Sequence, residues 1–188
     1  MEVADCMRIF VIAGLLALAA CSSPEVPAAK TTVASPGAVE APGTEATDDV
    51  YLDDRSNAQN LIRSYYNAIN RKEYARAWSY WKENSEVQPY EVFKDGFANT
   101  KHAVVTFGAG TSEGAAGNLY SSQHVALHVT NDNGTSEFYT GCYVAHISQP
   151  AVQDMVPFKP LGIRSAAMNK VASMQAASDT LSQPCEAN

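Results

Sequence analysis

Residues 58–78 read AQNLIRSYYNAINRKEYARAW, and this stretch decides the fold of the chain. Its apolar side chains recur at helical spacing, at Ala58, Leu61, Ile62, Tyr65 and Ile69. Residues three, four and seven positions apart lie on one face of a helix. The spacing therefore predicts an amphipathic helix that packs against a core, and we expect Asp53 or Asp54 to cap its start.

Two shorter helices are predicted to follow. The first has apolar residues at helical spacing again, at Tyr74, Ala77, Trp78 and Trp81. The second begins near Pro89, which suits the first turn of a helix, and carries Tyr90, Phe93 and Phe97 on one face. Three helices are thus expected within residues 54–99.

After residue 99 the apolar pattern becomes that of strands. Strands are predicted at 103–107, 120–130, 135–148 and 161–172. Residues 108–118 hold four glycines and are expected to form a mobile loop, whereas Asn131-Asp132-Asn133-Gly134 is a strong hairpin signal. Helices followed by an antiparallel meander predict an α+β fold, with three N-terminal helices packed on a curved antiparallel sheet.

Two motifs in the helical region resemble those of a known superfamily. YYNAIN at residues 65–70, followed by YARAW at 74–78, is similar to the opening helices of nuclear transport factor 2-like domains. That superfamily includes ketosteroid-isomerase-like and polyketide-cyclase-like proteins. The resemblance covers residues 54–172 as a pattern of elements and implies a cone-shaped domain with a pocket at its open end. It implies no single chemistry, because the fold hosts isomerases, hydratases and many non-catalytic modules.

The N-terminus is interpreted as an export signal. The apolar run Ile9–Ala20 has twelve residues and follows Arg8, whereas a membrane span needs about 20. The run ends in Leu-Ala-Ala-Cys, which resembles the lipobox of bacterial lipoproteins and implies that Cys21 carries the lipid. An ordinary signal peptide and a core helix are the alternatives. Because Glu2 and Asp5 make the start acidic, Met7 is the better initiator.

This interpretation divides the chain into four parts. They are a signal peptide at 1–20, the lipidated Cys21 with a flexible tether at 21–53, the α+β domain at 54–172 and a polar tail at 173–188. The tether is rich in Ala, Pro, Thr and Ser and cannot bury enough apolar surface to fold. The protein is expected to be exported and held at the membrane by its lipid anchor. In a Gram-negative cell, Ser22 favours the periplasmic side of the outer membrane.

Composition excludes several classes of function. The formal net charge of −7 argues against a nucleic-acid partner, since there is no excess of Lys and Arg to neutralise phosphates.

His124 and His128 cannot share one metal ion on a strand, where four residues span about 13 Å. We therefore expect neither a metal nor another cofactor. In an exported chain, Cys142 and Cys185 are expected to form a disulfide.

The two faces of the predicted hairpin can be sorted by strand alternation. A turn centred on residues 131–134 is expected to pair even residues of the first strand with odd residues of the second. The face toward the helices would carry Val125, Leu127, Val129, Phe138, Cys142 and Val144. The outward face would carry Tyr120, His124, His128, Glu137, Tyr139 and Tyr143.

This sorting has two consequences. His124, His128, Tyr139 and Tyr143 form a candidate interface for a protein partner or a homodimer, because Tyr is enriched in interface cores. A plain half-exposed sheet is the alternative. With Cys142 facing inward, the tail should fold over the helix-facing side and cap the cone.

A pocket in the cone is the other candidate site. Its expected lining is aromatic and apolar, with Tyr65, Trp78, Trp81, Phe93, Phe97 and Leu127 either surrounding a small apolar ligand or filling the core. No catalytic constellation stands out, and Asp95 is the one acid that could point inward. The expected function is a non-catalytic binding module on an envelope lipoprotein. The alternatives are a small isomerase or lyase that uses the cone, and a purely structural spacer.

Overall fold

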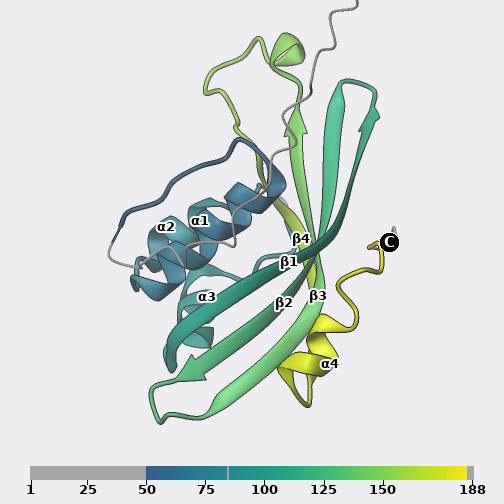
Figure 1. Cartoon of the computed structure of the whole chain (residues 1–188). Coiled ribbons are helices and arrows are strands. Elements are labelled where there is room, and N and C mark those ends of the chain that lie inside the picture. Colours follow the sequence, from purple (N-terminus) through teal and green to yellow (C-terminus); the bar gives the residue numbers. More distant parts are fainter. Residues whose placement is uncertain (1–49, 84, 186–188) are drawn as a thin grey trace, which may run out of the picture. The chain divides into compact units, whose positions relative to one another are not determined.

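The computed structural model describes residues 50–83 and 85–185 and has the expected α+β architecture (Figure 1). Three helices precede four antiparallel strands that are neighbours in sequence order. The predicted signal peptide, Cys21 and the tether up to residue 49 lie outside the described residues. Within the described part, none of the helices has the length and apolar character needed to span a bilayer.

The three predicted helices are all present. They are α1 (Ala58–Asn70), α2 (Tyr74–Ser79) and α3 (Tyr90–Gly96). The expected cap at Asp53 or Asp54 is wrong, because the Asn57 side chain accepts the Asn60 N–H at 2.9 Å and so caps α1. The carboxylate of Asp54 instead accepts the N–H of Ser56 in the turn before the helix.

The end of the predicted tether lies against the domain. The N–H of Leu52 donates to the Asn67 side chain on α1, and the Tyr80 hydroxyl donates to Asp53. The described residues 50–53 are therefore hydrogen-bonded to the fold.

The sheet is longer than the sequence pattern suggested. Its strands are β1 (Thr100–Ala115), β2 (Asn118–Asn131), β3 (Ser136–Ser148) and β4 (Gly162–Val171). The loop predicted at 108–118 is wrong, because β1 continues to Ala115 and returns through a tight turn at Gly117, where φ is +78°. The C-terminal segment passes very close to β1 at Gly108, where a Cβ would lie 2.1 Å from the Leu181 carbonyl oxygen.

The hairpin between β2 and β3 has the opposite alternation from the one predicted. Its loop has three residues, closed by the Asn131 N–H donating to the Thr135 carbonyl, with Gly134 at a φ of +81°. Leu127 is therefore paired with Tyr139, so odd residues pair with odd. The expected outward placement of Tyr139 is wrong for this reason.

The same shift places all the other side chains of β3 on the opposite face from the one predicted. Tyr143 faces the helices and belongs to the core, whereas Cys142 lies opposite His124 on the other side of the sheet. Phe138 and Val144 share the side of Cys142, because side chains alternate along a strand. A change of one residue in a hairpin loop reverses the faces of a whole strand.

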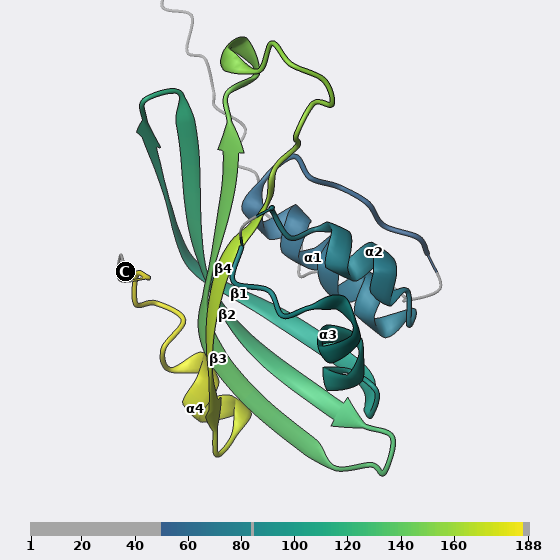
Figure 2. The same cartoon turned by 180° about the vertical axis from the view of Figure 1, so that it is seen from behind.

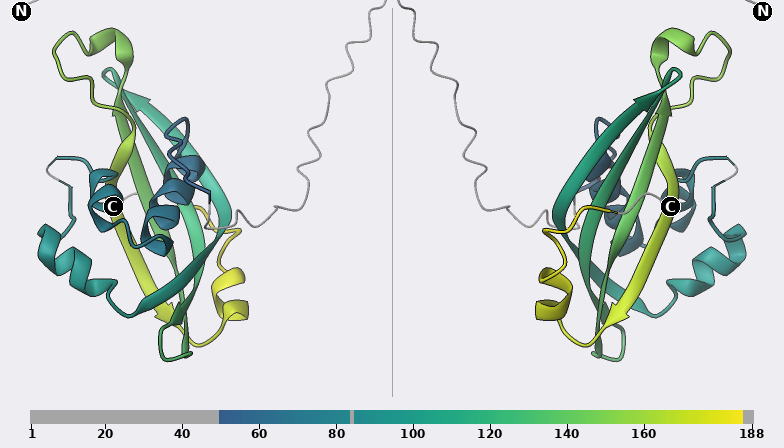
Figure 3. Two further views of the ribbon diagram at one scale, coloured as in Figure 1. Left: turned by 90° about the vertical axis from the view of Figure 1, so that its left-hand side faces the viewer. Right: turned by 90° about the vertical axis from the view of Figure 1, so that its right-hand side faces the viewer.

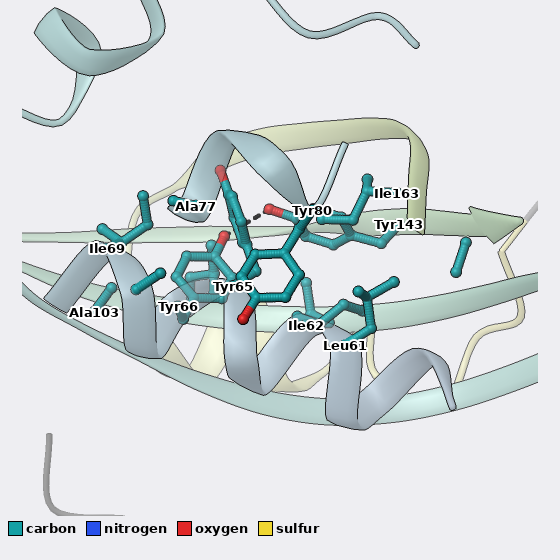
Figure 4. Packing of buried hydrophobic residues seen from close by; sticks show 14 of the residues in the cluster. Leu61, Ile62, Tyr65, Tyr66, Ile69, Ala77, Tyr80, Ala103, Tyr143 and Ile163 are labelled. Carbon is teal, nitrogen blue, oxygen red and sulfur yellow. Dashed lines mark hydrogen bonds between the residues drawn. The ribbon is translucent and has the colours of Figure 1, made fainter. Parts of the chain in front are cut away.

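Helices α1, α2 and α3 cover one face of the sheet, and a short fourth helix, α4 (Met174–Ser178), lies on the other (Figures 1 and 2). We call the side away from α1–α3 the outer face and residues 173–185 the strap. The core lies between α1 and the sheet, where Leu61, Ile62 and Tyr65 pack with Val125 and Tyr143 (Figure 4).

Candidate functional site

A cavity of about 690 Å³ lies on the helix-facing side of the sheet. Its apolar wall consists of Phe97, Ala103, Leu127, Val129 and Met168. Its polar end is formed by Asn99, Thr100, residues 131–133 at the end of β2 and in the hairpin loop, and Glu137. Three tyrosines, Tyr66, Tyr139 and Tyr143, complete the lining. The cavity thus has an apolar wall and a polar end, a combination that can hold an apolar molecule with a polar group.

Two of these tyrosines form a buried pair. The hydroxyls of Tyr66 on α1 and Tyr143 on β3 are 2.7 Å apart, and both side chains are almost fully buried. Figure 4 shows them next to Tyr65, whose ring meets each of theirs at 5.0 and 6.2 Å. Burial raises the pKa of Tyr143 to about 12 and also raises the pKa of Tyr66 well above its usual value. Both phenols are therefore protonated near neutral pH.

The tyrosine pair has one proton to spare. Two hydroxyls carry two protons, and the bond between them uses one. Among the residues that the structure describes, neither hydroxyl has a second hydrogen-bond partner. A buried O–H without an acceptor costs free energy, so this proton is ready to bond to an acceptor in the cavity.

The polar end of the cavity carries an ion pair. The Tyr139 hydroxyl donates to Glu137 at 2.8 Å, and the ammonium of Lys170 bonds to the same carboxylate. The Lys170 hydrogen bond, and next the one from Tyr139, lower the pKa of Glu137. The Glu137 carboxylate therefore remains ionised at the polar end of the cavity, where the ammonium of Lys170 balances its charge.

The residues predicted for the pocket are divided between the cavity and the core. Phe97 and Leu127 line the cavity. Tyr65 and Phe93 are buried in the core instead, and Trp81 packs edge-on against Tyr65. Trp78 lies outside, 39% exposed and in contact with Tyr90. Asp95, the acid considered for catalysis, is exposed on α3.

Two important lining residues were not among those predicted. Tyr66 lies next to Tyr65 and falls off the face defined by the first helical pattern, although its spacing of four from both Ile62 and Asn70 could have suggested a wider buried face. Tyr143 was assigned to the wrong side of the sheet, because the hairpin loop was expected to have a different length.

The predicted outward interface is not assembled. Of its four residues, Tyr139 and Tyr143 face the helices. His124 is on the outer face but only 7% exposed, because the strap covers it. His128 is on the same face, stacked on Phe138 at 5.0 Å and bonded to Ser136.

The disulfide between Cys142 and Cys185 is present, but the tail takes a different route from the one expected. Because Cys142 faces outward, the strap crosses the outer face of the sheet (Figure 3). No described strap residue lines the cavity, so the strap does not cap it. The cavity and the strap therefore lie on opposite sides of the sheet.

Comparisons with known proteins give likenesses in three dimensions alone. No family model and no curated protein matches the sequence. A putative aromatic ring hydroxylase from Novosphingobium aromaticivorans is 16% identical, with a TM-score of 0.47, over 64% of this chain and 90% of its own.

Two further solved structures have a similar arrangement. A putative dehydratase of the NTF2-like family from Streptomyces avermitilis is 10% identical, with a TM-score of 0.40, over 60% of this chain and 93% of its own. Mtr2 of Candida albicans is 8% identical, with a TM-score of 0.40, over 60% of this chain and 92% of its own. These structures include proteins described as enzymes and one solved in a protein complex, Mtr2 with the Mex67 M domain. Such distant likenesses say nothing of what this chain binds.

Proposed function

We propose that this protein is a lipid-anchored envelope lipoprotein whose α+β domain binds a small apolar molecule carrying a hydrogen-bond acceptor. The observation that carries the proposal is the Tyr66–Tyr143 hydroxyl pair, which lines the cavity with an unused proton. The ligand would place its carbonyl or hydroxyl oxygen against this pair. Its apolar body would contact Leu127, Val129 and Met168.

Binding without chemistry is the simpler use of this cavity. The pair can donate its one unused proton to an oxygen, and donors of this kind also stabilise an oxyanion in enzymes. An isomerase or lyase needs in addition a base within reach of the substrate. The described carboxylates that line the cavity are Asp132, in the exposed hairpin loop, and Glu137, which is held by Lys170. Because the tyrosine pair could stabilise an oxyanion, an isomerase or lyase activity is the second candidate function. It would be tested by turnover of a bound ketone.

A matched pair of probes tests the proposed contact. We expect 2-acetonaphthone, which has a carbonyl, to bind about 5-fold more tightly than 2-ethylnaphthalene, which has the same carbon skeleton without the oxygen, since a net hydrogen bond contributes about 1 kcal/mol. Affinities would be measured by displacement of fluorescent N-phenyl-1-naphthylamine. The double variant Tyr66→Phe/Tyr143→Phe should lose this preference while retaining affinity for the apolar probe.

Single variants and a distant control sharpen the test. Each single Tyr→Phe change leaves one hydroxyl with its proton free, so part of the preference should survive. Tyr120→Phe, an exposed position stacked on His146, should change nothing. Equal binding of the two probes by the unaltered protein would refute the role given to the tyrosine pair.

The anchor is tested separately, because it depends on the sequence of the N-terminus. Replacing Cys21 by serine removes the thioether-forming group of the lipobox. We expect this change to move the protein from the membrane fraction to the soluble fraction of the native cell. Unchanged membrane association of the Cys21→Ser protein would rule out anchoring at this cysteine.

A further inference from the structure

Three metal-binding side chains meet on the outer face of the sheet. A ring nitrogen of His124 and the sulfurs of Cys142 and Cys185 all lie within 4.8 Å of one another. His124 and Cys142 are directly opposed in the β2–β3 ladder, and Cys185 reaches them at the end of the strap. We propose that reduction of the disulfide converts this cluster into a binding site for one Zn²⁺ ion.

The donor set fits the ion. Zn²⁺ is bound by thiolates and imidazoles, and three protein ligands leave one coordination position for water. A dithiol can carry out the reduction: it transfers two electrons and two protons to the sulfurs and is itself oxidised to a disulfide. Each of the two resulting thiols then loses its proton as its sulfur bonds to the metal. In the oxidised protein Cys142 and Cys185 offer no thiolate, so this site cannot form.

The strap has contacts that do not depend on the disulfide. The N–H of Ala109 on β1 donates to the Leu181 carbonyl at 2.6 Å. The hydroxyls of Thr140 and Thr180 are 2.6 Å apart. Ser173 caps α4, which itself packs on β2 and β3. These interactions keep the end of the strap near Cys142 after the sulfur–sulfur bond is broken.

A backbone hydrogen bond holds the ring of His124 in place. Its Nδ1 lies 2.8 Å from the carbonyl of Gln183, and a carbonyl only accepts, so Nδ1 carries the hydrogen. A bond of this type from one ring nitrogen to a backbone carbonyl is what fixes the imidazole of most metal-ligating histidines.

When the ring is neutral, the other nitrogen has the lone pair that a metal ion needs. Nε2 is 3.1 Å from the Thr140 hydroxyl and 3.3 Å from that of Thr180. Both hydroxyls have alternative acceptors, the carbonyls of Val125 at 3.2 Å and Ala177 at 2.8 Å. One of the two protons forms the bond between the hydroxyls and the other can go to a carbonyl, so neither hydroxyl needs Nε2 as its acceptor when the ring binds a metal ion.

The test uses the full chain with Cys6 and Cys21 replaced by serine, so that Cys142 and Cys185 are its remaining cysteines. The protein is reduced with a phosphine, desalted without oxygen and titrated with Co²⁺, which reports thiolate ligation by a charge-transfer absorption band. We expect one equivalent of Co²⁺ to bind, to be displaced by Zn²⁺, and to give no band with the oxidised protein.

Two histidine variants distinguish metal binding that involves His124 from binding by the cysteines alone. His124→Gln is expected to weaken Co²⁺ binding by about 100-fold, because even the loss of a group that only supports a metal ligand costs 10–100-fold. His128→Gln, four residues along the same strand on the same face, should bind as the parent does. Cys185→Ser should also abolish the thiolate band.

Circular dichroism of each reduced sample would show whether the protein is still folded when it binds Co²⁺. An unfolded chain could bind cobalt through its two cysteines, but His124→Gln would then bind as tightly as the parent. Equal affinity of these two proteins, or no band from a folded reduced protein, would overturn the proposal.

Discussion

Replacing Cys142 and Cys185 together by serine is expected to lower the free energy of unfolding by about 4 kcal/mol. The two cysteines are 43 residues apart in the sequence, so the disulfide removes much of the freedom of the unfolded chain between β3 and the strap. The estimate is the entropic contribution alone. Urea denaturation of the oxidised parent and of the double variant would measure the difference.

Reduction offers a control for the same prediction. The parent protein treated with a phosphine should unfold at nearly the urea concentration that unfolds the double variant, whereas the double variant should not respond to the phosphine. If the oxidised parent and the double variant had the same midpoint, the disulfide would contribute nothing to stability. The strap would then be held by its hydrogen bonds to β1 and β3 alone.

Substituting alanine for Gly141 is expected to destabilise the fold by about 3 kcal/mol. Gly141 lies in β3 between Val125 of β2 and Met168 of β4. A Cβ at this position would come within 1.9 Å of the Ala167 carbonyl oxygen, which belongs to the neighbouring backbone and cannot rotate away. The strands would have to separate, and hydrogen bonds near the middle of the sheet would be lost.

Gly96 provides a matched substitution with the opposite sign. It lies at the end of α3, and a Cβ there would meet nothing within 4 Å. Gly96→Ala should therefore leave stability unchanged or raise it by about 0.5–1 kcal/mol, since alanine has less freedom in the unfolded chain. The two variants would be compared by thermal and urea unfolding. A Gly141→Ala protein as stable as the Gly96→Ala protein would contradict the close packing of β3 and β4.

The sequence alone was sufficient for the elements made of local contacts. The helical spacing of Leu61, Ile62 and Tyr65 predicted α1, because residues three and four apart meet on one face whatever lies beyond the helix. The turn residues between 131 and 134 predicted the hairpin, and the expectation of export predicted a disulfide between Cys142 and Cys185. Each of these inferences depends on residues close in sequence or on chemistry that has few alternatives.

The positions of the sites depended on register, which the local pattern leaves open. Whether the hairpin loop has three residues or four is settled by hydrogen bonds between strands and by the positive φ of Gly134. That one-residue difference places Tyr143 beside Tyr66 in the cavity and Cys142 beside His124 under the strap.

The extent of β1 was decided in the same way. Its glycines suggested a loop, but the approach of Leu181 to Gly108 requires a residue without a side chain within a strand. The sequence by itself thus determined the three N-terminal helices, the β2–β3 hairpin and the disulfide that joins the sheet to the tail, but neither the length of β1 nor helix α4. The tertiary structure decided which side chains meet, because side chains alternate along a strand and a shift of one residue exchanges the two faces of the sheet.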